Sequence, residues 1–188
     1  MSYKAGDSVD YVVTYLEMSA RPDYPRPAIV GSSQTALIRA ENPPAWYFLD
    51  LYDAVGRDYE WVDRHTQQRE ELDAWLQDEH VNMFSFLRLG WPHGFFVLDT
   101  RTTGICELAY FGLVPDATGK GLGKYLLHTA VHTGWDQADV AKMSVNTCTL
   151  DHPRALDLYT SAGFEVASRE QKSRVLTRDR SMPIAQSA

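Results

Sequence analysis

Hydrophobic residues occur along the chain in short strand-like runs and longer amphipathic runs, which turns rich in glycine, proline and polar residues separate. Runs rich in β-branched and aromatic residues predict strands at residues 9–18, 82–89, 95–99, 105–114, 143–150, 164–168 and 173–177. Helical periodicity predicts helices at residues 45–55, 67–78, 122–135 and 153–162. The polar stretch at residues 169–172 is expected to be a turn between the last two strands.

This order of elements indicates an α/β fold with one mixed sheet and helices packed against it. The length of 188 residues favours a single domain. Residues 1–80 are expected to hold the first strand and two helices, and residues 81–177 are expected to form the rest of the sheet with its helices. Residues 21–33 read as a loop because they contain three prolines and a Gly-Ser-Ser, and residues 178–188 read as a mobile tail.

The composition excludes several classes of protein. At 44% hydrophobic and 23% charged residues, the chain can bury a core and is not disordered. It has no apolar run long enough to span a bilayer, and its start lacks the apolar region of a signal peptide. Two cysteines, Cys106 and Cys148, do not suggest a disulfide framework. We therefore expect a cytoplasmic protein that does not bind membranes.

The net charge of −7 is concentrated in one segment, residues 50–79, which holds ten acidic and three basic residues. Such a surface excludes nucleic acid as a partner and would attract a cationic small molecule or a lysine side chain. A solvated helix face explains the same charges without a partner.

Three glycines stand between the strand that ends at Val114 and the helix that begins near Leu122. They are Gly119, Gly121 and Gly123. A helix N-terminus presents unpaired backbone N–H groups, and glycines let an anion approach them closely. Lys120 and Lys124 add positive charge. The spacing fits neither a Walker loop nor a dinucleotide fingerprint, so these glycines alone leave a simple turn open.

The surroundings are more specific. LVPDATGKGLGKYLL, followed by HPRALDLYTSAGF, resembles the GCN5-related N-acetyltransferase (GNAT) superfamily. The family pattern Q/R-x-x-G-x-G/A falls on residues 118–123, and N-x-x-A-x-x-L-Y-x-x-x-G-F falls on residues 152–164. The chain departs from these patterns at Thr118, where Gln or Arg is usual, and at His152, where Asn is usual. The resemblance covers about residues 80–177 and implies a mostly antiparallel sheet of about seven strands flanked by about four helices.

The resemblance also implies a reaction, acetyl transfer from acetyl-CoA to a primary amine by direct transfer in a ternary complex. Glu107, a carboxylate within an apolar strand, lies at the offset of the base in the histone-acetyltransferase branch. Burial would raise its pKa, although a solvated or hydrogen-bonded strand glutamate is the alternative. Tyr159 corresponds to the family's acid near the cofactor sulfur.

The same resemblance assigns the cofactor to the strand end, the glycine loop and the next strand. The expected cofactor-binding residues are Leu113, Val114, Thr118, Gly119, Lys120, Gly121, Leu122, Gly123, Lys124, Asn146 and His152. We expect residues 1–80 to form the acceptor side and residues 81–177 to form the acetyl-CoA-binding core. The acceptor is an unidentified amine, expected to be cationic, and a homodimer is open because family members often pair. A non-catalytic module that senses acyl-CoA, or an acyltransferase with another donor or acceptor, is the alternative.

Other features are weaker. His128 and His132 have the spacing of metal ligands but no third partner, so we predict no metal site. Cys148 is expected to be an inert thiol rather than a nucleophile. A set of aromatic residues could wall an acceptor pocket or fill the core, and the core is favoured. This set comprises Trp46, Tyr47, Tyr52, Tyr59 and Trp61.

Overall fold

The computed structural model describes residues 3–28, 34–181 and 184. The chain forms, in order, β1 (Ser8–Met18), β2 (Thr35–Ala40), α1 (Ala45–Gly56), α2 (Asp63–Thr66), α3 (Arg69–Leu76), β3 (Val81–Arg88), β4 (Trp91–Asp99), β5 (Ile105–Leu113), α4 (Leu122–Trp135), β6 (Lys142–Cys148), α5 (Ala155–Ser161) and β7 (Glu165–Val175). Short 3-10 turns follow α1 and β5, at Arg57–Tyr59 and Pro115–Ala117.

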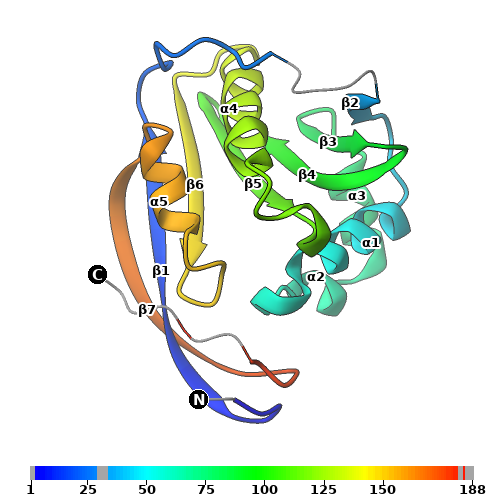
Figure 1. The fold of residues 1–188 in the computed structure, drawn as a ribbon, viewed down its shortest axis with the longest axis vertical. Helices are drawn as coiled ribbons and strands as arrows, with labels where there is room; N and C mark the ends of the chain where they lie inside the picture. The colour runs from blue at the N-terminus through cyan, green and yellow to red at the C-terminus, as the bar shows by residue number, and fades with distance from the viewer. Residues whose placement is uncertain (1–2, 29–33, 182–183, 185–188) are drawn as a thin grey trace.

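The strands form one seven-stranded sheet in the order β2-β3-β4-β5-β6-β1-β7, with helices on both faces (Figure 1). Every neighbouring pair is antiparallel except β5 and β6. The crossover between these two parallel strands is α4, as a parallel pair requires. The predicted fold class, a mixed and mostly antiparallel sheet with flanking helices, is confirmed.

The core lies on both faces of the sheet. On one face, Phe48 of α1 packs against Trp75 of α3 and Phe95 of β4. On the other face, Phe86 of β3 packs against Tyr125 of α4. In the described part of the chain, no helix combines the length and the hydropathy that a membrane crossing demands.

The parallel pair β5–β6 is unusually short. The two strands pair at three positions, Ile105↔Lys142, Cys106↔Met143 and Glu107↔Ser144, and then diverge (Figure 1). The register between β4 and β5 also shifts here, so that Ala109 has no partner residue in β4. A bulge of this kind bends its strand and increases its twist. The bulge therefore begins where the strands part and opens a gap in the middle of the sheet.

Two strand predictions were wrong. The edge strand β2 was not predicted, because its short run TALIRA has no clear alternation and depends on pairing with β3. The predicted strands at 164–168 and 173–177 form a single strand, β7, which pairs with β1 along its length. Residues 169–172 are polar because β7 is an exposed edge strand, not because they turn. The predicted loop is without helix or strand at residues 21–28, and residues 29–33 lie outside the described residues.

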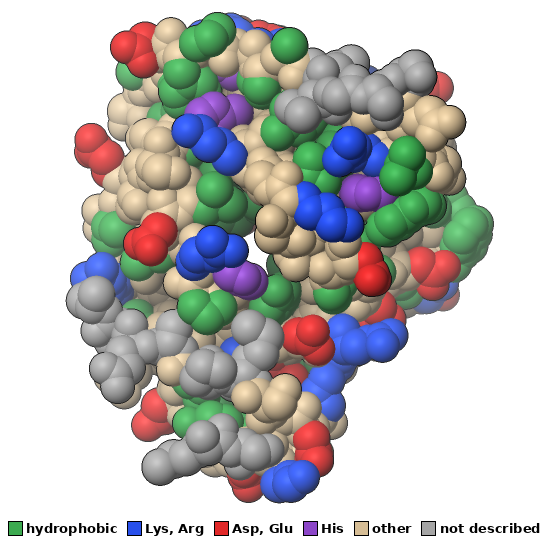
Figure 2. All heavy atoms as spheres, viewed as in Figure 1, with side chains coloured by type: hydrophobic (Ala, Val, Ile, Leu, Met, Phe, Trp, Pro, Cys, Tyr) green, Lys and Arg blue, Asp and Glu red, His purple; other side chains and the backbone are tan. Residues whose placement is uncertain are grey.

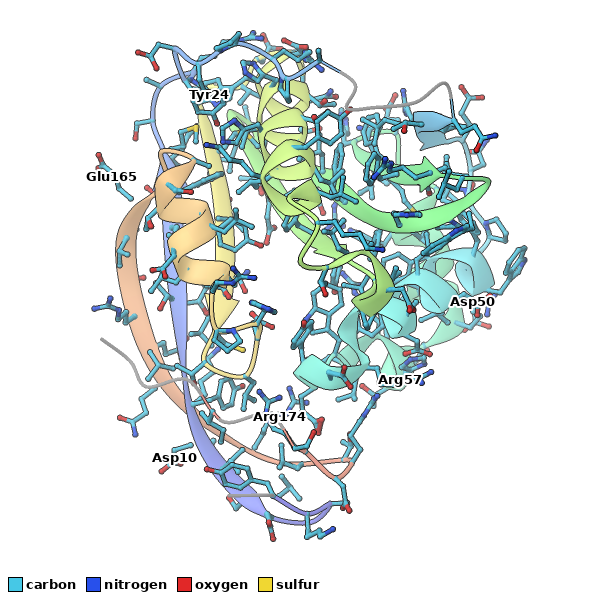
Figure 3. The ribbon with its side chains drawn as sticks, in the orientation of Figure 1. Asp10, Tyr24, Asp50, Arg57, Glu165 and Arg174 are labelled. Carbon is cyan, nitrogen blue, oxygen red and sulfur yellow. The ribbon has the colours of Figure 1, made fainter. Side chains whose placement is uncertain are left out.

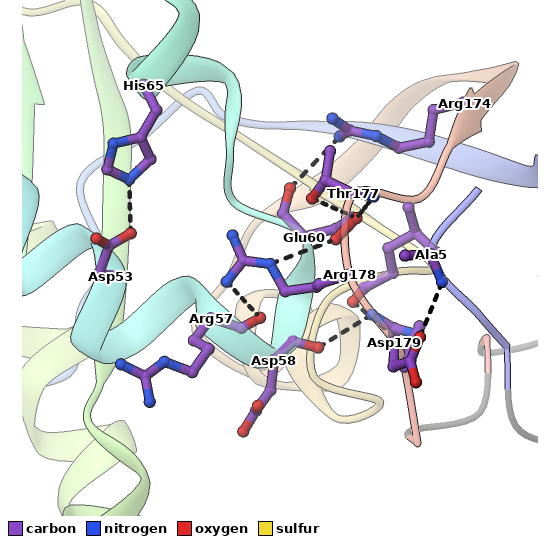
Figure 4. Close-up of polar contacts among 12 residues, drawn as sticks. Ala5, Asp53, Arg57, Asp58, Glu60, His65, Arg174, Thr177, Arg178 and Asp179 are labelled. Atoms are coloured by element: carbon purple, nitrogen blue, oxygen red, sulfur yellow. Dashed lines mark hydrogen bonds and ion pairs between the residues drawn. The ribbon is translucent and has the colours of Figure 1, made fainter. Parts of the chain in front are cut away.

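The segment after β7 is held against the turn between α1 and α2 (Figure 4). The carboxylate of Glu60, only 4% exposed, accepts bonds from the backbone N–H (2.6 Å) and hydroxyl (3.0 Å) of Thr177. Arg180, 5% exposed, donates to the carbonyls of Asp58 (3.0 Å) and Leu150 (2.8 Å). The start of the segment expected to be a mobile tail is thus fixed, while residues 182–183 and 185–188 lie outside the described residues.

We expect Glu60→Ala to lower the free energy of unfolding by about 1–3 kcal/mol, because it removes the buried carboxylate that accepts the N–H and hydroxyl of Thr177. Urea denaturation measures this loss. Glu165→Ala, which changes an exposed residue of β7, is the matched control and should change stability by less than about 0.5 kcal/mol. Equal stability of the two variants would show that the Glu60 contacts contribute little.

Candidate functional site

A cavity of about 900 Å³ occupies the gap between β5 and β6. Residues from both faces of the sheet line it, so it connects the side of α4 and α5 with the side of α1 and α2. Figure 2 shows a hollow near the centre of the face that carries α4 and α5. The sheet is therefore open through its middle at the place where two strands lack each other's hydrogen bonds.

The glycine loop forms one rim of this cavity. Gly119 and Gly121 have φ angles of +72° and +74°, and a Cβ at either position would meet no atom within 4 Å. Gly121 caps α4 without any side-chain hydrogen bond. The backbone N–H groups of residues 119–123 donate to no acceptor among the described residues. This open set of donors at a helix N-terminus fits a phosphate group.

The other loop residues divide into two groups. Lys124 and Thr118 line the cavity, but the Thr118 hydroxyl is already bonded to the carbonyl of Pro115 at 2.8 Å. Lys120 points elsewhere, since its ammonium donates to the carbonyl of Asp116 at 2.7 Å. Leu122 belongs to the buried core and does not line the cavity.

At the end of β5, Leu113 lines the cavity and Val114 does not. The N–H of Val114 donates to the carbonyl of His93 at 3.0 Å, and its own carbonyl accepts from Ala117 at 2.9 Å. Both backbone hydrogen-bonding groups of Val114 therefore already have partners within the protein. Of the two expected strand-end residues, only Leu113 lines the cavity.

The opposite wall comes from β6 and α5. Asn146, His152 and Tyr159 all line the cavity there. Nδ1 of His152 accepts a hydrogen bond from the N–H of Arg154 at 3.1 Å. Burial, and to a smaller extent the positive charge of Arg154, lowers the pKa of the His152 imidazole. Burial raises the pKa of Tyr159 well above its usual value, so its phenol is neutral at physiological pH. Its hydroxyl has no hydrogen-bond partner within the described chain and is free to meet a ligand.

Glu107 lies on the other face of the sheet, at the last paired position before the gap. It stands opposite Asp99 of β4 and lines the cavity. Its carboxylate makes no hydrogen bond to any described residue. Burial, reinforced by the charge of Asp99, raises its pKa, while Arg101 and Arg64 oppose the shift. A half-buried carboxylate with a raised pKa and a free lone pair is suited to accepting a proton.

The sequence reasoning missed several residues around Glu107. Burial alone would raise the pKa of Asp99, but hydrogen bonds from Arg101 and from Trp75 (3.0 Å) hold it below its usual value. Asp99 therefore keeps its negative charge beside Glu107. The sequence gives one weak signal for this pair, the two-residue spacing of Asp99 and Arg101 at a strand end.

Asp151 was missed as well. It accepts bonds from the Thr147 hydroxyl and the Cys148 N–H, both at 2.8 Å, and from Nε1 of Trp61 at 3.3 Å. Trp61 precedes α2 and Asp151 follows β6, so this contact links the two sides of the gap. Burial raises the pKa of the Cys148 thiol to about 12, which keeps it unreactive.

The aromatic set divides between the cavity lining and the core. Tyr52, Tyr59 and Trp61 line the cavity, and Tyr52 also belongs to the buried core. Trp46 is 58% exposed and does neither.

The two helix histidines lie away from the cavity. His128 stacks on Tyr24, with the ring centroids 4.1 Å apart, and His132 bonds the carbonyl of Tyr24 at 3.0 Å. Within the described ranges, no group of three or more His, Cys, Asp or Glu side chains is placed to hold a metal ion.

The sequence matches the acetyltransferase (GNAT) family over residues 48–164, more than half of the chain. The match covers the glycine loop, the split strands and α5. The chain belongs to the GNAT family. The sequence matches none of the curated proteins with which it was compared.

Solved structures show the same GNAT fold. A functionally unknown conserved protein from Staphylococcus epidermidis has a TM-score of 0.59 and 13% identity, covering 90% of this chain and 63% of its own. A GCN5-related N-acetyltransferase from Sphaerobacter thermophilus has a TM-score of 0.55 and 15% identity, and the match covers 98% of this chain and 56% of that protein. An aminoglycoside acetyltransferase from an uncultured soil metagenomic sample has a TM-score of 0.51 and 18% identity, and the match covers 69% of this chain and 87% of that protein. The chain spans less than two thirds of the length of the first two.

We expect Glu107→Gln to stabilise this GNAT domain increasingly as pH rises. Because folding raises the pKa of Glu107, ionisation disfavours the folded state above the ordinary glutamate pKa of 4.5. The neutral amide removes that penalty. Urea denaturation at pH 4 and pH 7 should therefore show a larger gain for the variant at pH 7. An equal difference at both values would mean that Glu107 ionises freely in the folded protein.

Proposed function

We propose that this GNAT chain is an acetyl-CoA-dependent N-acetyltransferase that acts on a primary amine by direct transfer in a ternary complex. The observation that carries the proposal is a cavity that passes through the sheet. It has a helix N-terminus with free backbone N–H groups on one side and the half-buried carboxylate of Glu107 on the other. A donor and an acceptor entering from opposite faces would meet in the gap between β5 and β6.

The donor would occupy the side of α4 and α5. Its pyrophosphate would accept bonds from the free N–H groups of residues 119–123, with Lys124 supplying positive charge. The pantetheine arm would lie along β5 at Leu113, in the gap that a neighbouring strand would otherwise fill. Asn146 and His152 would contact it from the opposite wall. Thr118, whose hydroxyl is already bonded to Pro115, would contribute less than the usual long side chain.

The acceptor would react as a neutral amine. Reaching that form from an ammonium costs about 4–5 kcal/mol at pH 7, and Glu107 would take the proton. The nitrogen lone pair then attacks the thioester carbonyl carbon, and the carbon–sulfur bond breaks as the tetrahedral intermediate collapses. Tyr159, neutral because it is buried, would protonate the departing thiolate. Because Glu107 already holds the first proton, the second amine proton leaves to solvent, and Tyr159 regains a proton from solvent. The products are then the amide and CoA thiol, and Glu107 releases its proton before the next cycle.

We expect Gly121→Glu to weaken acetyl-CoA binding by about tenfold or more, because it adds a negative side chain to the rim that would hold the pyrophosphate. Gly104→Glu is the matched control, since Gly104 has a φ of +76°, equally open surroundings and no place in the cavity. Isothermal calorimetry measures both. Equal affinities would place the pyrophosphate elsewhere. Tight binding by the wild type without transfer to any amine would favour an acyl-CoA-sensing module.

We expect Glu107→Gln to lower kcat/KM by about 100-fold or more and to flatten the rise of the rate with pH, because the proton acceptor is lost. Rates of CoA thiol release between pH 5.5 and pH 9.5 measure both effects. Glu165→Gln, on an exposed strand, serves as the control. An unchanged rate and profile would remove Glu107 from the role of base.

A further inference from the structure

The half of the cavity on the side of α1 and α2, where the acceptor would bind, contains an arginine that no carboxylate of the described chain neutralises. Arg64 lines the cavity from α2, and Glu107 lines the same cavity from β5. No described carboxylate lies within ion-pair distance of its guanidinium. This sets Arg64 apart from the other two arginines of this half: Arg101 is paired with Asp99 at 2.7 Å, and Arg174 is paired with Asp63 at 3.0 Å. Figure 3 shows Arg174 of β7 near α2.

The surroundings of Arg64 fix its guanidinium in place. Its Nε donates to the Tyr110 hydroxyl at 2.7 Å, and its Nη1 donates to Oε1 of Gln67 at 2.8 Å. The guanidinium carbon lies 4.1 Å from the centre of the Trp75 ring and 5.3 Å from that of Tyr110. Nη2 has no acceptor among the described residues. A planar fork held by stacking and by two bonds, with one edge still free, is preorganised to bind a carboxylate.

We propose that the acceptor carries a carboxylate as well as its amine, and that Arg64 binds this carboxylate while the amine faces Glu107. The substrate class is then a small amino acid or a similar amino-carboxylate. The proposal rests on the acetyl transfer proposed above and narrows its acceptor. It also replaces the purely cationic acceptor inferred from the acidic segment, because a polyamine would place a second positive charge at Arg64.

The test compares amino acids with their primary amides, which keep the amine and the side chain but lack the carboxylate charge. The twenty common L-amino acids and their amides are assayed with saturating acetyl-CoA, and kcat/KM is obtained from thiol release. For each pair, the acid-to-amide ratio in the wild type is divided by the ratio in Arg64→Gln, which cancels the different intrinsic reactivity of the two amines. For the best acceptors we expect this quotient to be about tenfold or more. Arg64→Lys should retain part of the preference.

Arg39→Gln, an exposed arginine on β2, is the matched control and should leave the ratio unchanged. Thermal unfolding of each variant confirms that the variants are folded at the assay temperature. If Arg64→Gln lowers both members of each pair equally, Arg64 positions Tyr110 or Glu107 and the proposal is overturned. If the wild type prefers amides or polyamines, the proposal fails while amine acetylation stands. Acetyl-CoA binding without transfer to any acceptor would defeat the proposed function and, with it, this inference.

Discussion

The parting of β5 and β6 after three paired residues is the constraint on which the site depends. A continuous sheet satisfies its backbone groups within itself and separates its two faces. Here the extra residue Ala109 bends β5 away, and the groups facing the gap must find partners elsewhere. A ligand with an extended, amide-bearing arm can supply them, which explains why the donor would bind as a substitute strand. This gap is the reason that the glycine loop and Glu107, which lie on opposite faces of the sheet, line the same cavity.

The gap would weaken the protein if the two halves of the sheet were joined only by those three residue pairs. Other contacts bridge them. Trp61 bonds Asp151 across the cavity, and the segment after β7 bonds the turn between α1 and α2 through Glu60 and Arg180. The C-terminal residues of the chain thereby brace the N-terminal helices. Several of the bridging side chains also line the cavity, so the same groups join the two halves of the sheet and shape the cavity.

The sequence predicted local structure well and missed what depends on distant partners. Runs rich in β-branched and aromatic residues identified β1 and the strands from β3 to β6, and helical periodicity identified α1. The edge strand β2 was missed because only β3 specifies it. The motifs identified the glycine rim, Tyr159 and Glu107 as neighbours of one cavity, although their chemical roles stay predictions. Arg64 gave no signal, because its lack of a counter-ion is visible only once α2, α3 and β5 are brought together.

The polar run in β7 that reads as a turn has a consequence for the behaviour of the protein in concentrated solution. β7 ends the sheet with eleven residues, nearly all exposed, and no described strand pairs with the N–H and C=O groups of its outer edge. Such an edge could pair with a strand of another molecule and start aggregation. Arg169, Glu170 and Lys172 place charges of both signs along it, which makes apolar stacking of a second chain unfavourable. The residues that obscured the strand in the sequence are thus those that keep its edge from recruiting other molecules.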